Sequence, residues 1–147
     1  MPITHMCSNG RALLISELPT IEMDIESSRL IPCVAMITAW TMEAIYMPLW
    51  KPLIELLLKK GCSHIVCAGS HADQLHDLID EIVIDGEEFL KDMPFDVVLT
   101  TYHDDETSEE VVEFFTGTTD LWNKENGGLV AVLDDLDADI RSFLLKM

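Results

Sequence analysis

The chain has little positive charge. It carries nine lysine and arginine residues against 27 aspartate and glutamate residues, which gives 147 residues a formal net charge of −18. Strong binding of nucleic acid depends on basic side chains that contact phosphates, so this composition argues against a nucleic-acid partner. Hydrophobic residues make up 48% of the chain, which excludes generic disorder and suffices for the core of one domain over residues 1–147.

Long apolar stretches are also missing. The longest, residues 30–40, contains a proline and a threonine and is much shorter than the roughly 20 residues that span a bilayer. The N-terminus has no basic segment followed by an apolar one, as a secretory signal does. Cys33 and Cys67 lie within apolar runs, which is typical of buried free thiols in a reducing compartment. We therefore expect a cytoplasmic protein that does not act at a membrane.

The common cofactor and nucleophile motifs are absent. No Gly-x-x-x-x-Gly-Lys, Gly-x-Gly-x-x-Gly or Gly-x-Ser-x-Gly occurs, so neither a nucleoside triphosphate nor a dinucleotide is expected. Cys62, His64 and Cys67 do not have the spacing of a zinc site, because on a strand the first two share a face that Cys67 does not. We expect no bound metal and no cofactor.

Four continuous apolar runs of strand length alternate with helical patterns. The runs cover residues 31–39, 63–68, 95–101 and 128–133. Continuous rather than alternating runs indicate strands buried on both faces, hence a parallel sheet between two layers of helices. The sequence predicts an α/β fold, a three-layer sandwich with a mostly parallel sheet of four or five strands, Rossmann-like or flavodoxin-like.

Repeating β-α units thus account for residues 31–147, and residues 1–30 form a peripheral N-terminal segment. Within that segment, residues 12–15 and the alternating Ile21, Met23 and Ile25 fit short strands at a sheet edge. Residues 82–84 fit either a helix end or a short strand.

Helix starts can be predicted from capping residues. Thr107 with Glu110 matches a capping box, and Ser70 with Asp73 resembles one. The last helix is expected to begin at Asp134 or Asp135, which would cap it.

Polar side chains follow the predicted strands at the sheet edge where ligands bind in open parallel sheets. A histidine oriented by a carboxylate can move protons near neutral pH. One hypothesis is therefore a small hydrolase, with or without a divalent cation that activates water, in which His103 acts as general base. Its candidate catalytic residues are His71, His103, Asp104 and Asp134. The simpler interpretation is that these carboxylates only cap helices.

The acidic residues are concentrated in the second half. Residues 1–75 hold seven acidic and five basic side chains, whereas residues 76–147 hold 20 and four. Such asymmetry attracts a cationic partner, although acidic side chains also serve solubility. The three tryptophans fall in or near predicted connections, where aromatic residues either contact partners or close the core.

We therefore favour a non-enzymatic binding protein over the hydrolase. It would neutralise or regulate a basic protein partner, as immunity proteins, antitoxins and inhibitors do. The expected contact residues are Asp104, Asp105, Glu106, Glu109 and Glu110, with Trp40, Trp50 and Trp122. A third hypothesis is a module of a larger complex or homo-oligomer, joined through a sheet edge or residues 40–50.

Overall fold

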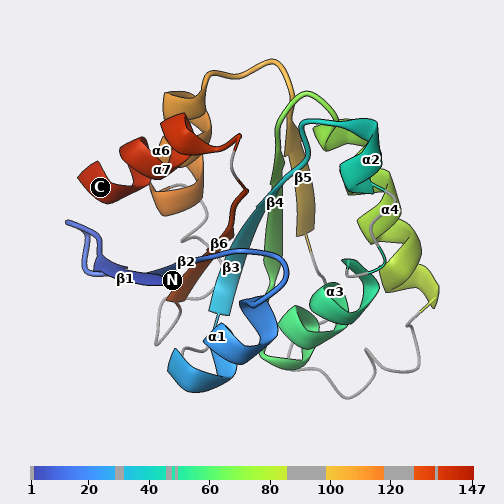
Figure 1. Ribbon diagram of the computed structural model, residues 1–147, viewed down its shortest axis with the longest axis horizontal. Helices are drawn as coiled ribbons and strands as arrows, with labels where there is room; N and C mark the ends of the chain where they lie inside the picture. Colours follow the sequence, from blue (N-terminus) through green and yellow to red (C-terminus); the bar gives the residue numbers. More distant parts are fainter. Residues whose placement is uncertain are drawn as a thin grey trace.

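A six-stranded sheet forms the centre of the computed structural model. The structure describes residues 2–28, 32–45, 48, 50–85, 99–117, 128–134 and 136–147, without the side chains of residues 28, 32, 33, 42, 44 and 85. Its order is β1-β2-β6-β3-β4-β5 (Figure 1). The strands are β1 (Ile3–Met6), β2 (Ala12–Ser16), β3 (Pro32–Thr38), β4 (His64–Ala68), β5 (Leu99–His103) and β6 (Gly128–Val132). Only β1 is antiparallel to its neighbour.

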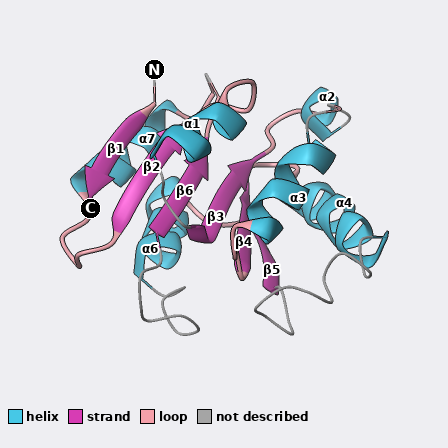
Figure 2. Ribbon diagram, turned by 90° about the horizontal axis from the view of Figure 1, so that it is seen from below, coloured by secondary structure: helices cyan, strands magenta, loops and turns pink. Residues whose placement is uncertain are grey.

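Helices cover both faces of this sheet (Figures 1 and 2). One face carries α1 (Ile21–Ser28), α2 (Met42–Ile45), α3 (Trp50–Lys59) and α4 (Ala72–Asp85), and the other carries α6 (Ser108–Gly117) and α7 (Ala138–Lys146). Alternate residues of each strand enter the two cores: Ile65 and Cys67 of β4 pack on the first face, and Val66 and Ala68 on the second. This confirms the α/β class and the mostly parallel sheet with a Rossmann-like or flavodoxin-like layout. The predicted number of strands, four or five, is too low, because the described residues form a sheet of six.

Burial on both faces explains the continuous apolar runs. Every residue of β4 and β6 is buried, because each of these strands has a neighbour on both sides and a helical layer above and below. Strand β5 lies at the edge and is more exposed. Its predicted beginning, residues 95–98, lies outside the described residues.

The N-terminal segment departs from expectation in two ways. Residues 12–15 do form a strand, but β2 lies one place in from the edge and pairs with β6, and the edge itself is β1. The proposed strand at Ile21, Met23 and Ile25 is wrong, because these residues belong to α1. Ile21 and Ile25 are buried one helical turn apart, whereas Met23 is 69% exposed, so the period is helical.

The capping predictions give mixed results. Thr107 and Glu110 form the capping box: the Glu110 amide donates to Thr107 Oγ1 at 3.2 Å, and the Thr107 amide donates to Glu110 Oε1 at 3.2 Å. Ser70 forms no such box, since its hydroxyl donates to the Trp40 carbonyl at 3.0 Å and α4 begins at Ala72. Residues 82–84 belong to α4.

The last helix begins later than expected. Helix α7 starts at Ala138 and is preceded by Asp137, so Asp134 does not cap it. Asp135 lies outside the described residues.

The connections at the carboxyl ends of the strands leave in both directions. The chain continues to the α1–α4 face after β2, β3 and β4, and to the α6–α7 face after β5 and β6. Neighbouring strands whose connections diverge leave space between the loops, and ligands of open α/β sheets bind there. No helix in the described ranges has the length and apolarity needed to cross a membrane.

Candidate functional site

A tight turn after β4 draws two loops together at this edge of the sheet. Gly69 has φ +97°, and a Cβ atom there would overlap the carbonyl group of Ala39. That same carbonyl accepts the His71 amide at 3.0 Å, and the Ala39 amide donates to Ala68 at 3.0 Å. Only glycine permits this approach, which places the loop after β3 directly against the start of α4.

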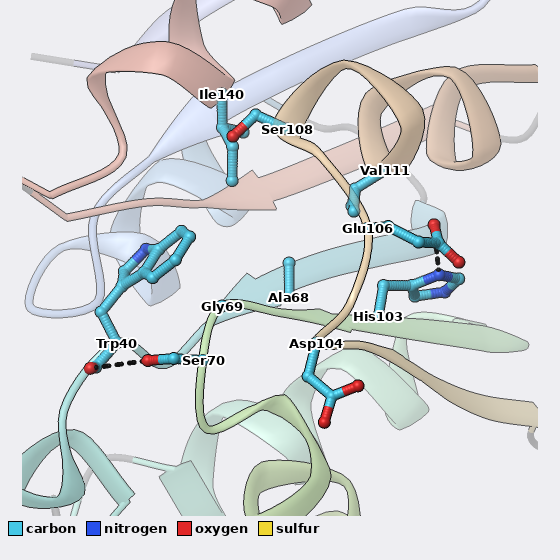
Figure 3. A pocket seen from close by; sticks show the side chains of 10 residues that line it. All are labelled: Trp40, Ala68, Gly69, Ser70, His103, Asp104, Glu106, Ser108, Val111 and Ile140. Carbon is cyan, nitrogen blue, oxygen red and sulfur yellow. Dashed lines mark hydrogen bonds and ion pairs between the residues drawn. The ribbon is translucent and has the colours of Figure 1, made fainter.

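A small cavity opens beside this turn (Figure 3). Its volume is about 90 Å³, and its walls come from the loops after β3, β4 and β5 and from α6 and α7. Figure 3 shows Trp40 on one side and Ala68 at the centre, with Ser108 and Ile140 opposite Ser70. Pockets for drug-sized ligands are roughly 300–1,000 Å³, so this one admits no more than a side chain or a group of similar size.

Asp137 fixes the tryptophan wall of the cavity. Its carboxylate is 1% exposed and accepts three hydrogen bonds. Thr38 Oγ1 donates to Oδ2 at 2.5 Å, the Asp134 amide donates to Oδ2 at 2.8 Å, and Trp40 Nε1 donates to Oδ1. Burial raises the pKa of Asp137, and the three hydrogen bonds oppose that rise. We call Asp137, Thr38, Trp40 and Asp134 the aspartate network.

A second polar network runs along β4 and β5 on the α6 face. Glu106 Oε2 lies 3.0 Å from His103 Nδ1, and His103 Nε2 lies 3.0 Å from Thr101 Oγ1. The same hydroxyl lies 3.0 Å from His64 Nε2. The ring of Phe114, from α6, packs against both imidazoles at centroid distances of 4.6 and 5.7 Å. We call Glu106, His103, Thr101 and His64 the histidine network.

The carboxylate at one end determines the direction of these hydrogen bonds. With Glu106 ionised and His103 neutral, His103 donates from Nδ1 and its Nε2 accepts from the Thr101 hydroxyl. The hydroxyl oxygen then accepts from His64 Nε2–H, which leaves the Nδ1 lone pair of His64 buried and without a partner among the described residues. Burial, aided by His103, lowers the pKa of His64 to about 4, so this imidazole is neutral at physiological pH.

Five exposed acidic side chains follow β5 closely in the sequence, and two of them, Asp104 and Glu106, line the cavity. They are Asp104, Asp105, Glu106, Glu109 and Glu110, in the loop after β5 and the first turn of α6. Within the described ranges none of them pairs with a lysine or arginine; Glu106 pairs with His103. We call these five residues the acidic rim. Two of the carboxylates lie in the first helical turn, where the helix dipole favours negative charge.

The predicted catalytic residues are only partly brought together. His103 and Asp104 line the cavity, whereas His71 and Asp134 do not. His71 Nδ1 contacts Gln74 Oε1 at 2.9 Å, and Asp134 accepts the Leu136 amide at 2.7 Å. Three residues that matter to the geometry, Thr101, His64 and Asp137, were not among the predicted catalytic or contact residues.

The predicted aromatic contacts have three different outcomes. Trp40 is partly exposed at the cavity. Trp50 is 4% exposed and packs in the core of the first face, so its expected role as a surface contact is wrong: it is the first residue of α3 and lies on the buried side of that helix. Trp122 lies outside the described residues.

The structure offers no evident metal centre in the ranges it describes. No group of three or more histidine, cysteine, aspartate or glutamate side chains there has a suitable geometry. Cys7 and Cys67 are buried free thiols, and burial raises the pKa of Cys67, which keeps it protonated and unreactive.

Comparison with known proteins identifies a family. The model of a family described as Domain of unknown function (DUF7684) matches residues 14–144, from within β2 to within α7. The matched region contains the cavity, both polar networks and the acidic rim, and it leaves out the edge strand β1. No curated protein and no solved structure is significantly similar to the chain.

Proposed function

The chain belongs to the DUF7684 family, and we propose that it is a binding protein whose acidic rim docks onto a basic surface of another protein. One observation carries this proposal. Five of the seven residues 104–110 are exposed carboxylates, and none has a lysine or arginine partner in the described part of the chain. A partner with the opposite charge would supply the missing contacts.

Capping and solubility account for only part of this charge. Glu109 and Glu110 complement the dipole of α6, but Asp104 and Asp105 precede the helix. A net charge of roughly −2 to −8 suffices to keep a small domain soluble, and this chain carries −18. Complementary charge speeds the association of proteins and selects the partner. We propose that the negative charge beyond what solubility needs has this role.

An aromatic contact lies beside the rim. The Asp137 carboxylate fixes the indole of Trp40 at the cavity wall, so Trp40 loses little conformational freedom on binding. The partner we propose is a basic protein that this chain neutralises or regulates, as immunity proteins, antitoxins and inhibitors do. We also propose that it is cytoplasmic, because Cys7 and Cys67 are buried free thiols.

Two variants that lose the same charge test this proposal. The first, Asp104→Asn/Asp105→Asn/Glu109→Gln, removes three rim charges and keeps Glu106 and Glu110, which hold His103 and the capping box. The control, Asp73→Asn/Asp77→Asn/Glu81→Gln, removes three exposed charges from α4. Each protein is immobilised in native lysate at low and high salt, bound proteins are identified by mass spectrometry, and the affinity of the purified partner is measured.

We expect a stoichiometric basic protein that high salt releases. Its affinity should fall about tenfold or more for the rim variant, because charge pairs across an interface are lost, and stay close to wild type for the α4 variant. Equal losses in the two variants would show that net charge alone drives the binding. Equal retention, or the absence of a basic partner, would count against a docking role for the acidic rim.

A further inference from the structure

The histidine network contains the arrangement of a hydrolytic triad. We propose that Thr101, His103 and Glu106 act as nucleophile, base and orienting carboxylate, and that the chain hydrolyses small neutral or cationic acyl esters. This inference is independent of the proposed docking function, which needs no chemistry. It also differs from the catalytic set expected from the sequence, since of that set only His103 takes part.

The distances meet the geometric requirement for such a triad. A nucleophile and its base, and the base and its carboxylate, are expected within about 2.6–3.2 Å, and both distances here are 3.0 Å. The two nitrogens of His103 have the correct roles, because Nδ1 donates to Glu106 and Nε2 accepts the proton of the Thr101 hydroxyl. Triads are recognised by this geometry on unrelated folds rather than by their order in the sequence.

His64 is a positioning residue in this arrangement. Its Nε2–H donates to Thr101 Oγ1 at 3.0 Å, which leaves the hydroxyl proton directed at His103. The ring is 3% exposed, yet its Nδ1 has no partner among the described residues. A buried polar atom without a partner lowers the stability of the fold. If His64 served only for packing, an apolar residue at this position would make the protein more stable.

The surroundings indicate the class of substrate. Thr101 lies on the edge strand β5, which is more exposed than β4 or β6. Phe114 offers apolar surface next to both imidazoles, which suits a short apolar acyl group. The acidic rim repels anions, so the substrate is neutral or cationic.

The chemical steps balance within these residues and water. Thr101 Oγ1 attacks the carbonyl carbon of the ester while its proton passes to His103 Nε2, and Glu106 stabilises the imidazolium that forms. The tetrahedral intermediate then expels the alcohol, which takes that proton, and the acyl group stays on Thr101. Water gives a proton to His103 Nε2 and attacks the carbonyl carbon of this acyl-threonine. The bond between that carbon and Thr101 Oγ1 then breaks, His103 returns the proton to Oγ1, and the carboxylic acid is released.

Hydrolysis of p-nitrophenyl acetate and p-nitrophenyl butyrate tests the proposal. Thr101→Val removes the hydroxyl and keeps the shape of the side chain, and Thr100→Val is the matched control on the same strand. We expect Thr101→Val to lower kcat/KM about 100-fold or more, since it removes the nucleophile that general base catalysis activates, and Thr100→Val to leave it unchanged. After acid quenching, peptide mass spectrometry should find the acyl group on Thr101.

Three results would overturn the assignment. They are equal rates for the wild type and a folded Thr101→Val variant, an acyl group carried by a cysteine or another residue, and failure of the wild type to react at Thr101 with a fluorophosphonate probe. The probe experiment needs no variant, so it decides the matter even if Thr101→Val does not fold.

The role of His64 has its own test. His64→Leu should lower kcat about tenfold with little change in KM, and His64→Gln, whose amide can donate to Thr101, should restore part of the loss. Identical kcat values for the two variants would assign His64 to packing alone.

Discussion

The two polar networks at the sheet differ in whether their hydrogen bonds are complete. In the aspartate network, the Asp137 carboxylate receives donors from Thr38, Trp40 and Asp134, and it is 1% exposed. Its donors come from β3, from the loop after β3 and from the loop after β6. The buried carboxylate is not accessible to a ligand, so it serves to hold two loops in place.

The histidine network is incomplete at both ends. Its carboxylate, Glu106, is 40% exposed, and the buried Nδ1 atom of His64 at the other end has no partner among the described residues. Its hydroxyl belongs to Thr101, which is partly exposed on the edge strand β5. Under the proposed triad, the reactive network differs from the structural one in the completeness of its hydrogen bonds rather than in burial alone.

The largest expected effect on stability comes from breaking the complete network. Asp137→Ala leaves the Trp40 indole N–H and the Thr38 hydroxyl without their acceptor, and it should lower the free energy of unfolding by about 3 kcal/mol. Asp139→Ala, which removes an exposed acidic residue from the first turn of the helix that follows, α7, is the control. Urea denaturation followed by circular dichroism measures both. Similar small losses would mean that the aspartate network contributes little to the fold.

A smaller effect, which depends on pH, is expected for His64. Its pKa is lowered from 6.5 to about 4 in the folded protein, so the unfolded chain binds the proton more tightly. The stability that the neutral ring contributes is therefore complete above pH 6.5 and is lost as the pH falls toward 4. The change is on the order of 2–3 kcal/mol.

His64→Leu isolates this contribution from the carboxylates that titrate in the same window. The difference in unfolding free energy between wild type and variant should shrink or change sign between pH 7 and pH 4.5. A difference that stays constant over this range would mean that His64 has the same pKa in both states.

The smallest effect is expected at the exposed end of the histidine network. Glu106→Gln should lower the free energy of unfolding by less than about 1 kcal/mol, because partly exposed pairs contribute little. Nitrogen-15 NMR of the histidines should nevertheless show a change at His103, which loses the carboxylate that holds its proton on Nδ1. A large loss of stability without a change at His103 would mean that the histidine network, like the aspartate network, serves to hold the fold together.

Much of the layered fold could be predicted from the sequence, because burial on both faces produces continuous apolar runs that are visible locally. The helix at Ile21 and Ile25 could not be predicted, because apolar residues spaced two and four apart fit a strand as well as a helix. Only the exposure of Met23 in the structure distinguishes the helix from the strand. The strand order depends on contacts between distant segments, which local periodicity does not record.

The candidate site, like the fold, could be predicted from the sequence only in part. His103 and Asp104 follow a strand, so their place at the carboxyl edge could be inferred. Thr101 lies inside that strand, where a threonine is unremarkable until His64, on the neighbouring strand, is seen beside it. Asp137 resembles any acidic residue near the start of a helix, and only the tertiary structure shows that its carboxylate is directed toward Trp40.

The position of β6 has a consequence for the synthesis of the protein. It lies between β2 and β3, yet it is made after all the other described strands. Until it leaves the ribosome, the β1–β2 hairpin and the β3–β4–β5 group have no strand to join them, and each exposes an unpaired edge of apolar residues. A nascent chain halted after β5 therefore consists of two incomplete sheets, for which a chaperone that shields strand edges would be most useful.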